Sequence, residues 1–223
     1  TDTAIQDALP MVDKNTIVVT VQNGLKNMEI IKEYVPFEQV VGGTTTEGSS
    51  VIDLGHVNHT GRGETKLGGK NSEAVESVAA CLNRATIDTT IVDDPEAQIW
   101  EKQVVSVAIK PIAALTELLD GPLAEFEDTA WVMEQLVQEA VLIAESRGIK
   151  LSSEDPFETV REVCEVNYET KSSMLEDVQE HRKTEIDHIN GAITEYGDKA
   201  DIPTPFNEMA VALVKGKEKS YLD

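Results

Sequence analysis

The hydrophobic pattern of the chain changes at Asp93–Pro95. Before this point, short β-branched runs that are typical of strands alternate with segments of helical spacing. After it the strand-like runs stop, and apolar residues recur at helical spacing with Gly and Pro between the segments. We therefore expect an α/β domain over residues 1–95 and an all-helical domain over residues 96–223.

The first domain is expected to contain only part of a Rossmann-like sheet. Residues 3–11 have helical spacing and lead directly into a strand of internal type, as though the first half of the sheet were missing. No G-x-G-x-x-G motif follows a strand. The predicted elements are a buried strand over Thr16–Val21, a helix over Leu25–Tyr34, strands joined by tight turns over Val40–Gly69, a helix over Ser72–Arg84 and a strand over Thr89–Val92.

The second domain is predicted to be a set of helices without internal repeats. Two cysteines, one in each domain, fall in segments of helical spacing, and we interpret Cys81 and Cys164 as buried thiols in a reducing compartment. The predicted helices are Ile99–Leu119, Thr129–Arg147, Asp155–Asn167, Met174–Tyr196 and Asn207–Lys217.

Charge excludes several classes of partner. The chain has 19 Lys and Arg against 41 Asp and Glu, a net charge of −22. A field of this sign repels phosphate backbones and anionic lipids, so we expect no nucleic-acid or membrane partner. The acidic residues are spread along the whole sequence, which fits either adaptation to high salt or an ordinary acidic cytosolic protein. No apolar stretch is long enough to cross a bilayer, nothing indicates export, and we expect a cytoplasmic protein.

The first helix of the second domain carries the most informative polar residues. Lys102, Ser106 and Lys110 follow one another at intervals of four residues, which places them on one stripe of a largely apolar helix. A buried ammonium is costly unless it faces a partner or a polar cleft. One interpretation is therefore a binding cleft. The other is that Lys102 reaches solvent from the first turn and that Lys110 marks an exposed kink before Pro111.

Two further places allow both a functional and a structural interpretation. Asn23 follows the first predicted strand, at the edge where open α/β sheets bind ligands, or it caps the next helix with Gly24 in the turn. Ser173 and Glu185 project into a cleft in the functional interpretation. In the structural one, their segments are helix starts with capping boxes, formed by Ser173 with Glu176 and by Thr184 with Asp187.

A metal site is the less favoured interpretation of one further group. His181, Glu185 and His188 would share one face of a helix, but no further ligand cluster accompanies them. We therefore predict no metal site.

The order of the short motifs resembles that of the ketopantoate reductase family over nearly the whole chain. Each motif alone is weak, but their combination in family order is specific. They are Val21–Gly24, Val41–Gly48, His59–Thr65, Ile99–Lys102, Ser172–Asp177, Thr184–Asp187, Ile189–Gly191 and Ile202–Pro205.

The resemblance implies an oxidoreductase that reduces 2-dehydropantoate to pantoate with NADP as cofactor, in pantothenate and coenzyme A biosynthesis, and that forms a homodimer. It implies that Lys102 is the catalytic lysine. It further implies that Asn23 lies beside cofactor and substrate, that Ser173 and Glu185 bind substrate, and that Glu185 also contacts the cofactor. Ser106 and Lys110 occupy the two remaining substrate-binding positions of this helix.

Two departures from the family pattern modify this expectation. Ser106 and Lys110 stand where family members commonly have asparagines, and Lys110 adds charge and bulk where the pantoate hydroxyl would bind. The alternative is therefore a reductase of another branched 2-keto acid. The glycine-rich loop is absent, so we expect a truncated form that binds NADP poorly, or a non-catalytic fragment for substrate binding and dimerisation.

Overall fold

The computed structural model describes residues 1–222, and the chain divides into two compact units between Ile99 and Trp100. Unit 1 contains every strand of the described residues, whereas the described part of unit 2 consists of helices and connecting loops. The predicted combination of an α/β half and an all-helical half is therefore confirmed. Within residues 1–222, no helix has both the length and the apolar composition that a membrane span requires.

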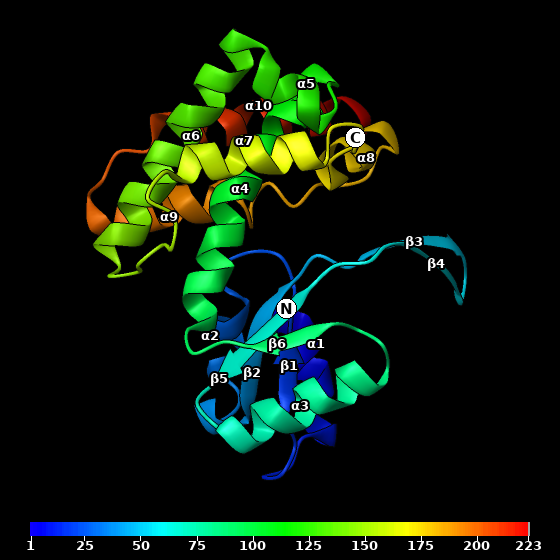
Figure 1. Ribbon diagram of the computed structural model, residues 1–223. Helices are drawn as coiled ribbons and strands as arrows, with labels where there is room; N and C mark the ends of the chain where they lie inside the picture. The colour runs from blue at the N-terminus through cyan, green and yellow to red at the C-terminus, as the bar shows by residue number, and fades with distance from the viewer. Residues whose placement is uncertain (223) are drawn as a thin grey trace. The chain divides into compact units, whose positions relative to one another are not determined.

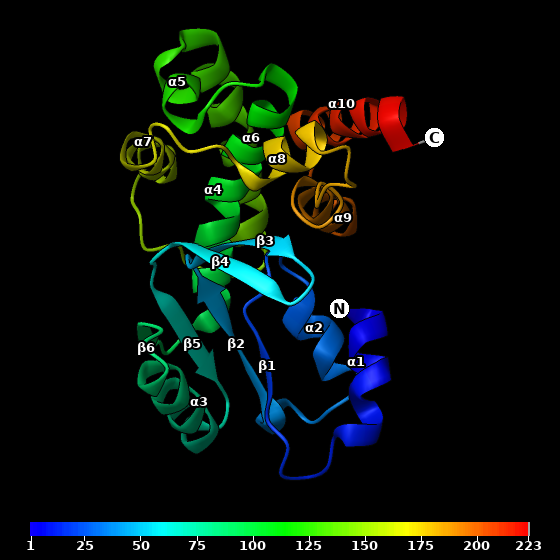
Figure 2. The same cartoon turned by 90° about the vertical axis from the view of Figure 1, so that its right-hand side faces the viewer.

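The larger sheet of unit 1 has four strands in the order β1-β2-β5-β6 (Figure 2). Strands β1 and β2 are parallel, as are β5 and β6, whereas β2 and β5 are antiparallel. A partial mixed sheet of this kind agrees with the prediction. The strands are β1 (Val18–Thr20), β2 (Val40–Thr45), β5 (Thr65–Gly69) and β6 (Thr89–Ile91).

Strand β2 carries core residues on both faces of this sheet. Val40 and Val41 are buried, and because they are neighbours in a strand their side chains point to opposite faces. Val40 packs with Met28 and Ile31 of α2, and Val41 packs with Val75 of α3. Helices thus cover both faces of β2. The helical elements of unit 1 are α1 (Asp2–Ala8), η1 (Leu9–Met11), α2 (Asn27–Lys32), η2 (Phe37–Gln39) and α3 (Ser72–Arg84).

The first predicted strand is shorter and less buried than expected. It was predicted over Thr16–Val21 as a buried strand, but β1 contains three residues. Thr20 is 4% exposed whereas Val19, which points to the opposite face, is 41% exposed. A continuous β-branched run predicts burial on both faces. Val18 packs against the cluster of α2, and the residues that flank β1, Ile17 and Val21, pack against the cluster of α3, so the face that carries Val19 is covered only in part.

A separate hairpin is formed by β3 (Gly48–Asp53) and β4 (His56–Gly61). Its turn contains Gly55, which has a φ of 76°, a left-handed conformation that glycine adopts without strain. The side chains of Val51 and Leu54 are exposed. The hairpin therefore contributes little to the core of unit 1.

Unit 2 is built around α4, which begins at Pro95 and continues to Thr116 (Figure 1). Pro111 lies inside this helix and does not end it. The other helices of the described part are α5 (Asp120–Glu125), α6 (Glu127–Ser146), α7 (Pro156–Val166), α8 (Ser173–Gln179), α9 (Asn190–Ala200) and α10 (Pro205–Leu222).

A buried polar cluster joins four helices of unit 2. The Nδ2 group of Asn190 in α9 donates to the carbonyl of Val107 in α4 at 3.0 Å and to Oδ1 of Asn207 in α10 at 2.9 Å. The Nδ2 group of Asn207 donates in turn to Oε2 of Glu139 in α6 at 2.7 Å. Losing any of these bonds would leave a polar group unsatisfied in the core, so the cluster fixes how these helices pack.

Three local predictions for the helices are wrong. The helix predicted over Met174–Tyr196 is divided into α8 and α9 by the loop 180–189, in which His181 has a φ of 56°. Helix α5 lies in the segment between the predicted helices Ile99–Leu119 and Thr129–Arg147, where no helix was predicted; its Pro122 is tolerated because it is in the first turn. Cys164 is buried as predicted, but Cys81 is exposed, because it lies beside the buried stripe of α3 and not within it.

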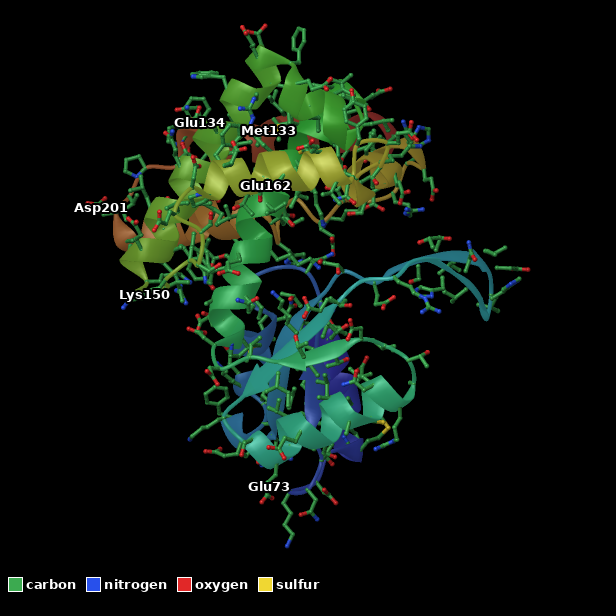
Figure 3. All side chains as sticks on the ribbon, viewed as in Figure 1. Glu73, Met133, Glu134, Lys150, Glu162 and Asp201 are labelled. Atoms are coloured by element: carbon green, nitrogen blue, oxygen red, sulfur yellow. The ribbon has the colours of Figure 1, made fainter. Side chains whose placement is uncertain are left out.

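Acidic side chains are exposed on elements of both units. Figure 3 marks Glu73 in unit 1 and Glu162 and Asp201 in unit 2, all of them exposed, whereas Met133 is fully buried. The negative charge of the chain is therefore carried at its surface.

Candidate active site

The candidate site of unit 2 begins on α4. Lys102, Ser106 and Lys110 all lie in this helix, and the residues between them are mostly buried apolar side chains. Ser106 is 8% exposed and the side chain of Lys110 is 14% exposed. The stripe predicted from sequence is therefore present, and its polar groups are largely removed from solvent.

Lys102 has a pKa that is lowered from 10.5 to about 8. Burial is the main cause, and the positive charge of Lys110 acts in the same direction, whereas the carboxylate of Glu185 opposes the change. At neutral pH the group is still mainly an ammonium, but it loses its proton more easily than a lysine in water. A lysine in this state can serve as a proton donor.

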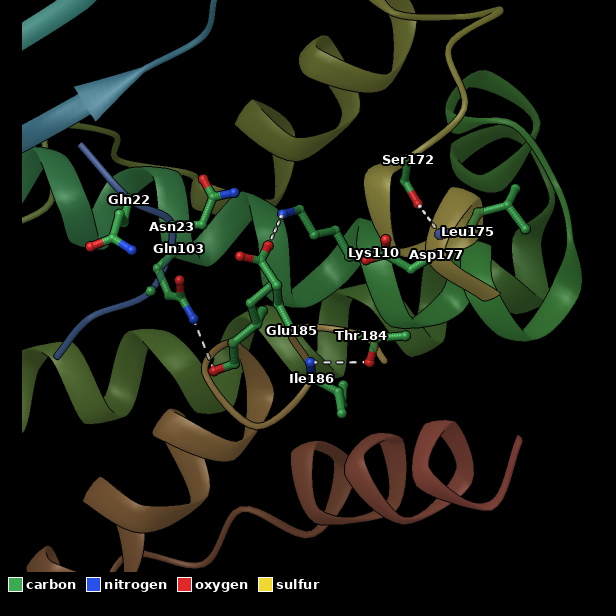
Figure 4. A network of polar contacts seen from close by, with 12 residues as sticks. Gln22, Asn23, Gln103, Lys110, Ser172, Leu175, Asp177, Thr184, Glu185 and Ile186 are labelled. Atoms are coloured by element: carbon green, nitrogen blue, oxygen red, sulfur yellow. Dashed lines mark hydrogen bonds and ion pairs between the residues drawn. The ribbon is translucent and has the colours of Figure 1, made fainter. Parts of the chain in front are cut away.

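Lys110 is paired with Glu185 across the site, with 3.6 Å between Nζ and Oε2 (Figure 4). Burial lowers the pKa of Lys110, and the charge of Glu185 and a hydrogen bond to it act against that effect. The alternative in which Lys110 marks an exposed kink is wrong, because its side chain is mostly buried and α4 continues beyond Pro111.

Glu185 is presented by the loop 180–189 and not by a helix. The carbonyl of Glu185 accepts hydrogen bonds from the backbone N–H groups of His188 at 2.9 Å and Ile189 at 3.1 Å, which closes a turn. The hydroxyl of Thr184 accepts from the N–H of Ile186 at 3.3 Å, so the predicted capping box with Asp187 is not formed. His181, Glu185 and His188 also do not share a helical face, because this segment is not helical.

The loop is bonded to other helices on both sides of Glu185. Before Glu185, the N–H of Thr184 donates to Oε1 of Glu218 in α10 at 2.6 Å. After it, Nε2 of Gln103 in α4 donates to the carbonyl of Ile189 at 2.9 Å (Figure 4). Glu185 is therefore held between α4 and α10.

Ser173 is an exposed residue in the first turn of α8. The cap of this helix is Ser172, whose Oγ accepts from the N–H of Leu175 at 3.3 Å, so the capping box predicted for Ser173 and Glu176 is wrong by one residue. Both serines satisfy the sequence preference for a cap, and only packing selects the buried Ser172. The side chain of Ser173 has no capping role and stays a predicted substrate contact.

Asp120 is a charged group near this site that sequence reasoning missed. It is 6% exposed, and one of its carboxylate oxygens, Oδ1, makes no hydrogen bond in the described structure. Burial raises the pKa of Asp120 from 3.8 to about 6, and the charge of Lys110 opposes this rise. The sequence placed it in a turn with Gly121 and Pro122, where an acidic residue gives no functional signal.

Asn23 belongs to unit 1, directly after β1. It does not cap the next helix: α2 has Lys26 at its N-cap, and the side chain of Asn27 donates to the carbonyl oxygens of Asn23 and Gly24. Gly24 has a φ of 100°, which allows the turn. Asn23 thus lies at the carboxyl end of a strand that is parallel to β2, the place predicted for it.

Comparison with known proteins relates both units to one family. The family model described as "Ketopantoate reductase PanE/ApbA" matches residues 1–72, and the model of the C-terminal part of the same family matches residues 94–218. The chain belongs to the ketopantoate reductase family. The predicted resemblance is confirmed.

Two curated relatives of this family have similar sequences. The 2-dehydropantoate 2-reductase of Halobacterium salinarum is 36% identical over 202 residues, covering 89% of this chain and 66% of the relative. The enzyme of the same name from Pyrococcus horikoshii is 36% identical over 222 residues, covering 98% of this chain and 72% of the relative. The chain therefore spans about two thirds to three quarters of the length of these proteins.

Solved structures agree with the fold. A PanE/ApbA family ketopantoate reductase from Ralstonia eutropha has a TM-score of 0.90 at 28% identity, covering 99% of this chain and 73% of that one. D-Mandelate dehydrogenase with NADH and anilino(oxo)acetate has a TM-score of 0.89 at 25% identity, covering 100% of this chain and 74% of that one. The fold is thus shared by enzymes of the ketopantoate reductase family and a dehydrogenase crystallised with NADH.

Proposed function

We propose that this chain forms the substrate-binding part of a reductase that converts 2-dehydropantoate to pantoate with NADPH. The observation that carries the proposal is Lys102, a largely buried ammonium whose pKa is lowered to about 8 by burial and by the charge of Lys110, with Glu185 as the opposing negative charge. The names of the curated relatives supply the substrate. Reduction of a keto group needs a proton donor at the carbonyl oxygen, which is the role that this lysine fits.

Charge also favours an anionic substrate at this place. The chain as a whole carries −22, which repels a 2-keto acid in solution. Lys102 and Lys110 are two positive charges on one stripe of α4. They provide the local attraction that the carboxylate and the keto oxygen require.

The proposed reaction has a simple balance. When bound, a reduced nicotinamide would supply a hydride for the keto carbon and would be left in its oxidised form, while the C=O double bond of the substrate becomes a single bond. Lys102 stabilises the negative charge that develops on the oxygen and gives it a proton, and the resulting amine takes a proton back from water. Ser106 lies one turn away from Lys102 and has a hydroxyl that can donate to the same substrate.

The residues of this chain fit a nicotinamide cofactor in part. Asn23 and Gly24 follow a strand that is parallel to its neighbour, and the side-chain amide of Asn23 can bind the nicotinamide end. The printed sequence has no glycine-rich turn between a strand and a helix for the pyrophosphate. The use of NADPH in preference to NADH is part of the proposal.

Binding and turnover test the proposal separately. Calorimetric titration of the chain with 2-dehydropantoate is expected to show binding that weakens in Lys102→Ala. Turnover is measured by NADPH oxidation with the chain alone and with the chain joined in frame to a glycine-rich nucleotide-binding segment. Failure of 2-dehydropantoate both to bind and to be reduced in the joined protein would exclude the proposed substrate.

A second candidate is a reductase of another 2-keto acid. Lys110 favours it, because a charge stands where the family resemblance implies a neutral amide. Asp120 adds a second charged group that interacts with Lys110. The fold is also shared with a D-mandelate dehydrogenase. A panel of 2-keto acids with hydroxylated, branched and aromatic side chains decides between the two through the ratio of their kcat/KM values.

A further inference from the structure

The carboxyl group of Glu218 is buried at the C-terminal end of unit 2, far along the chain from the predicted site residues. Glu218 lies in α10 and is 6% exposed. Its Oε1 accepts the backbone N–H of Thr184 at 2.6 Å. Buried carboxyl groups are rare and are kept where they make specific bonds. The bond that Glu218 makes is to the residue that precedes Glu185.

Two further contacts from α10 to this stretch of the loop are exposed. Lys215 pairs with Asp187 at 2.5 Å, but both side chains are 40% exposed or more. Tyr221 donates its hydroxyl to the carbonyl of Arg182 at 2.9 Å in an exposed position. Exposed contacts of this kind restrain a loop weakly because water competes for them. Of these three contacts from α10, the bond of Glu218 is the buried one.

The opposite end of the loop is held from α4. Gln103 donates to the carbonyl of Ile189 in a buried bond of 2.9 Å, and Gln103 is the neighbour of Lys102. The bond at Thr184 lies directly before Glu185 and the bond at Ile189 lies four residues after it, so the backbone is restrained on both sides of Glu185.

We propose that Glu218 is a positioning residue, which holds Glu185 against Lys110 by binding the backbone of the residue before it. Glu218 does not touch the substrate in this proposal. It acts through Glu185, and its effect on turnover rests on the function proposed above. A protein in which Glu218 is lost keeps all the side chains of the site but holds Glu185 less firmly.

Two substitutions separate this role from simple stability. Glu218→Ala removes the acceptor for the N–H of Thr184, whereas Glu218→Gln keeps a carbonyl oxygen in nearly the same place. Glu208→Ala is the matched control, because Glu208 lies in the same helix and is exposed. We expect Glu218→Ala to raise KM by about tenfold with a smaller change in kcat, below the ~10²-fold that a 1 Å misplacement can cost. Glu218→Gln is expected to restore most of the loss, and Glu208→Ala to change KM less than twofold, since exposed substitutions are usually near neutral.

A measurement without substrate keeps this proposal distinct from the proposed reaction. The Cε resonance of Lys110, followed by NMR, reports whether its ammonium is still paired with Glu185. We expect it to move towards the value of an exposed lysine in Glu218→Ala and to stay in place in Glu218→Gln and Glu208→Ala.

If the resonance responds in this way but no variant, including the wild type, reduces a 2-keto acid, the proposed function fails and the positioning role stands. If Glu218→Ala lowers the melting temperature while the Lys110 resonance and KM stay unchanged, Glu218 is merely structural and the proposal is overturned.

Discussion

Helix α4 and the loop 180–189 supply the two opposite charges of the candidate site, and they hold them by different means. In α4 the spacing of Lys102 and Lys110 is set by the backbone hydrogen bonds of the helix itself. In the loop, Glu185 is held by a turn of its own and by buried bonds to Gln103 and Glu218. The helix therefore positions its charges locally, whereas the loop depends on residues far away in the chain.

The largest expected effect is the loss of Lys102, which would show that the helical side of the site carries the chemistry. We expect Lys102→Ala to lower turnover of the active enzyme at least a hundredfold, within the ~10²–10⁴ that general acid catalysis provides. Steady-state kinetics with saturating 2-keto acid measures this directly. Turnover like that of the wild type would remove Lys102 from the mechanism.

Whereas loss of Lys102 should lower turnover, we expect Lys102→Met to raise the stability of the fold. Because burial lowers the pKa of Lys102 from 10.5 to about 8, the folded protein carries a desolvated ammonium below about pH 8, and this cost disappears above pH 10.5 where the lysine is neutral in both states. Methionine keeps the apolar stem without the charge. We expect a higher urea midpoint near neutral pH and a gain that fades as the pH rises towards 10.5. A lower midpoint at neutral pH would mean that the ammonium stabilises the fold.

Gln103→Ala tests the hydrogen bond between α4 and the loop 180–189. This change leaves the carbonyl of Ile189 without its buried donor, and we expect a loss of about 1–3 kcal/mol in the free energy of unfolding. Gln138→Ala is the control, because Gln138 is an exposed glutamine in α6. Equal urea midpoints for the two variants would show that the loop does not depend on α4.

Asp120 lies outside both α4 and the loop 180–189, and its substitution measures how much its buried charge lowers the free energy of unfolding. Since burial raises the pKa of Asp120 from 3.8 to about 6, ionising it costs folding free energy that is absent below pH 3.8, builds up between these values and is complete above about pH 6. Asp120→Asn should therefore stabilise the protein by about 1–2 kcal/mol at neutral pH and have no effect at acid pH. Urea denaturation at several pH values measures the difference. A constant effect at all pH values would contradict the assignment.

The smallest effect is expected in the pH profile of Lys110→Met. The charge of Lys110 lowers the pKa of Lys102, so its removal should raise that pKa and move the alkaline loss of activity to higher pH. Removing Lys110 also leaves Glu185 to act on Lys102 alone, which works in the same direction. The profile of kcat against pH checks this. A shift to lower pH would show that Lys110 acts on Lys102 by another route.

Hydrophobic periodicity predicted α3 with its observed bounds and placed β2 and most helices of unit 2 closely, because these elements have long repeats. It failed at the short β1. It also failed at the loop 180–189, where the sequence has helical spacing but the residues do not form a helix. His181 in that loop has a left-handed backbone, and no residue-type pattern indicated it. The capping residue of α8 was missed by one position because two adjacent serines have the same propensity.

The sequence alone determined the family, the α/β and helical halves, and the stripe of Lys102, Ser106 and Lys110, because each depends on local order and helical spacing. Only the tertiary structure decided that Glu185 pairs with Lys110, that Asp120 is buried with a raised pKa, and that Glu218 accepts a hydrogen bond from the backbone of Thr184. These depend on contacts between segments that are distant in the chain. Burial, which sets the energy of a charge or a hydrogen bond, exists only once those segments have packed.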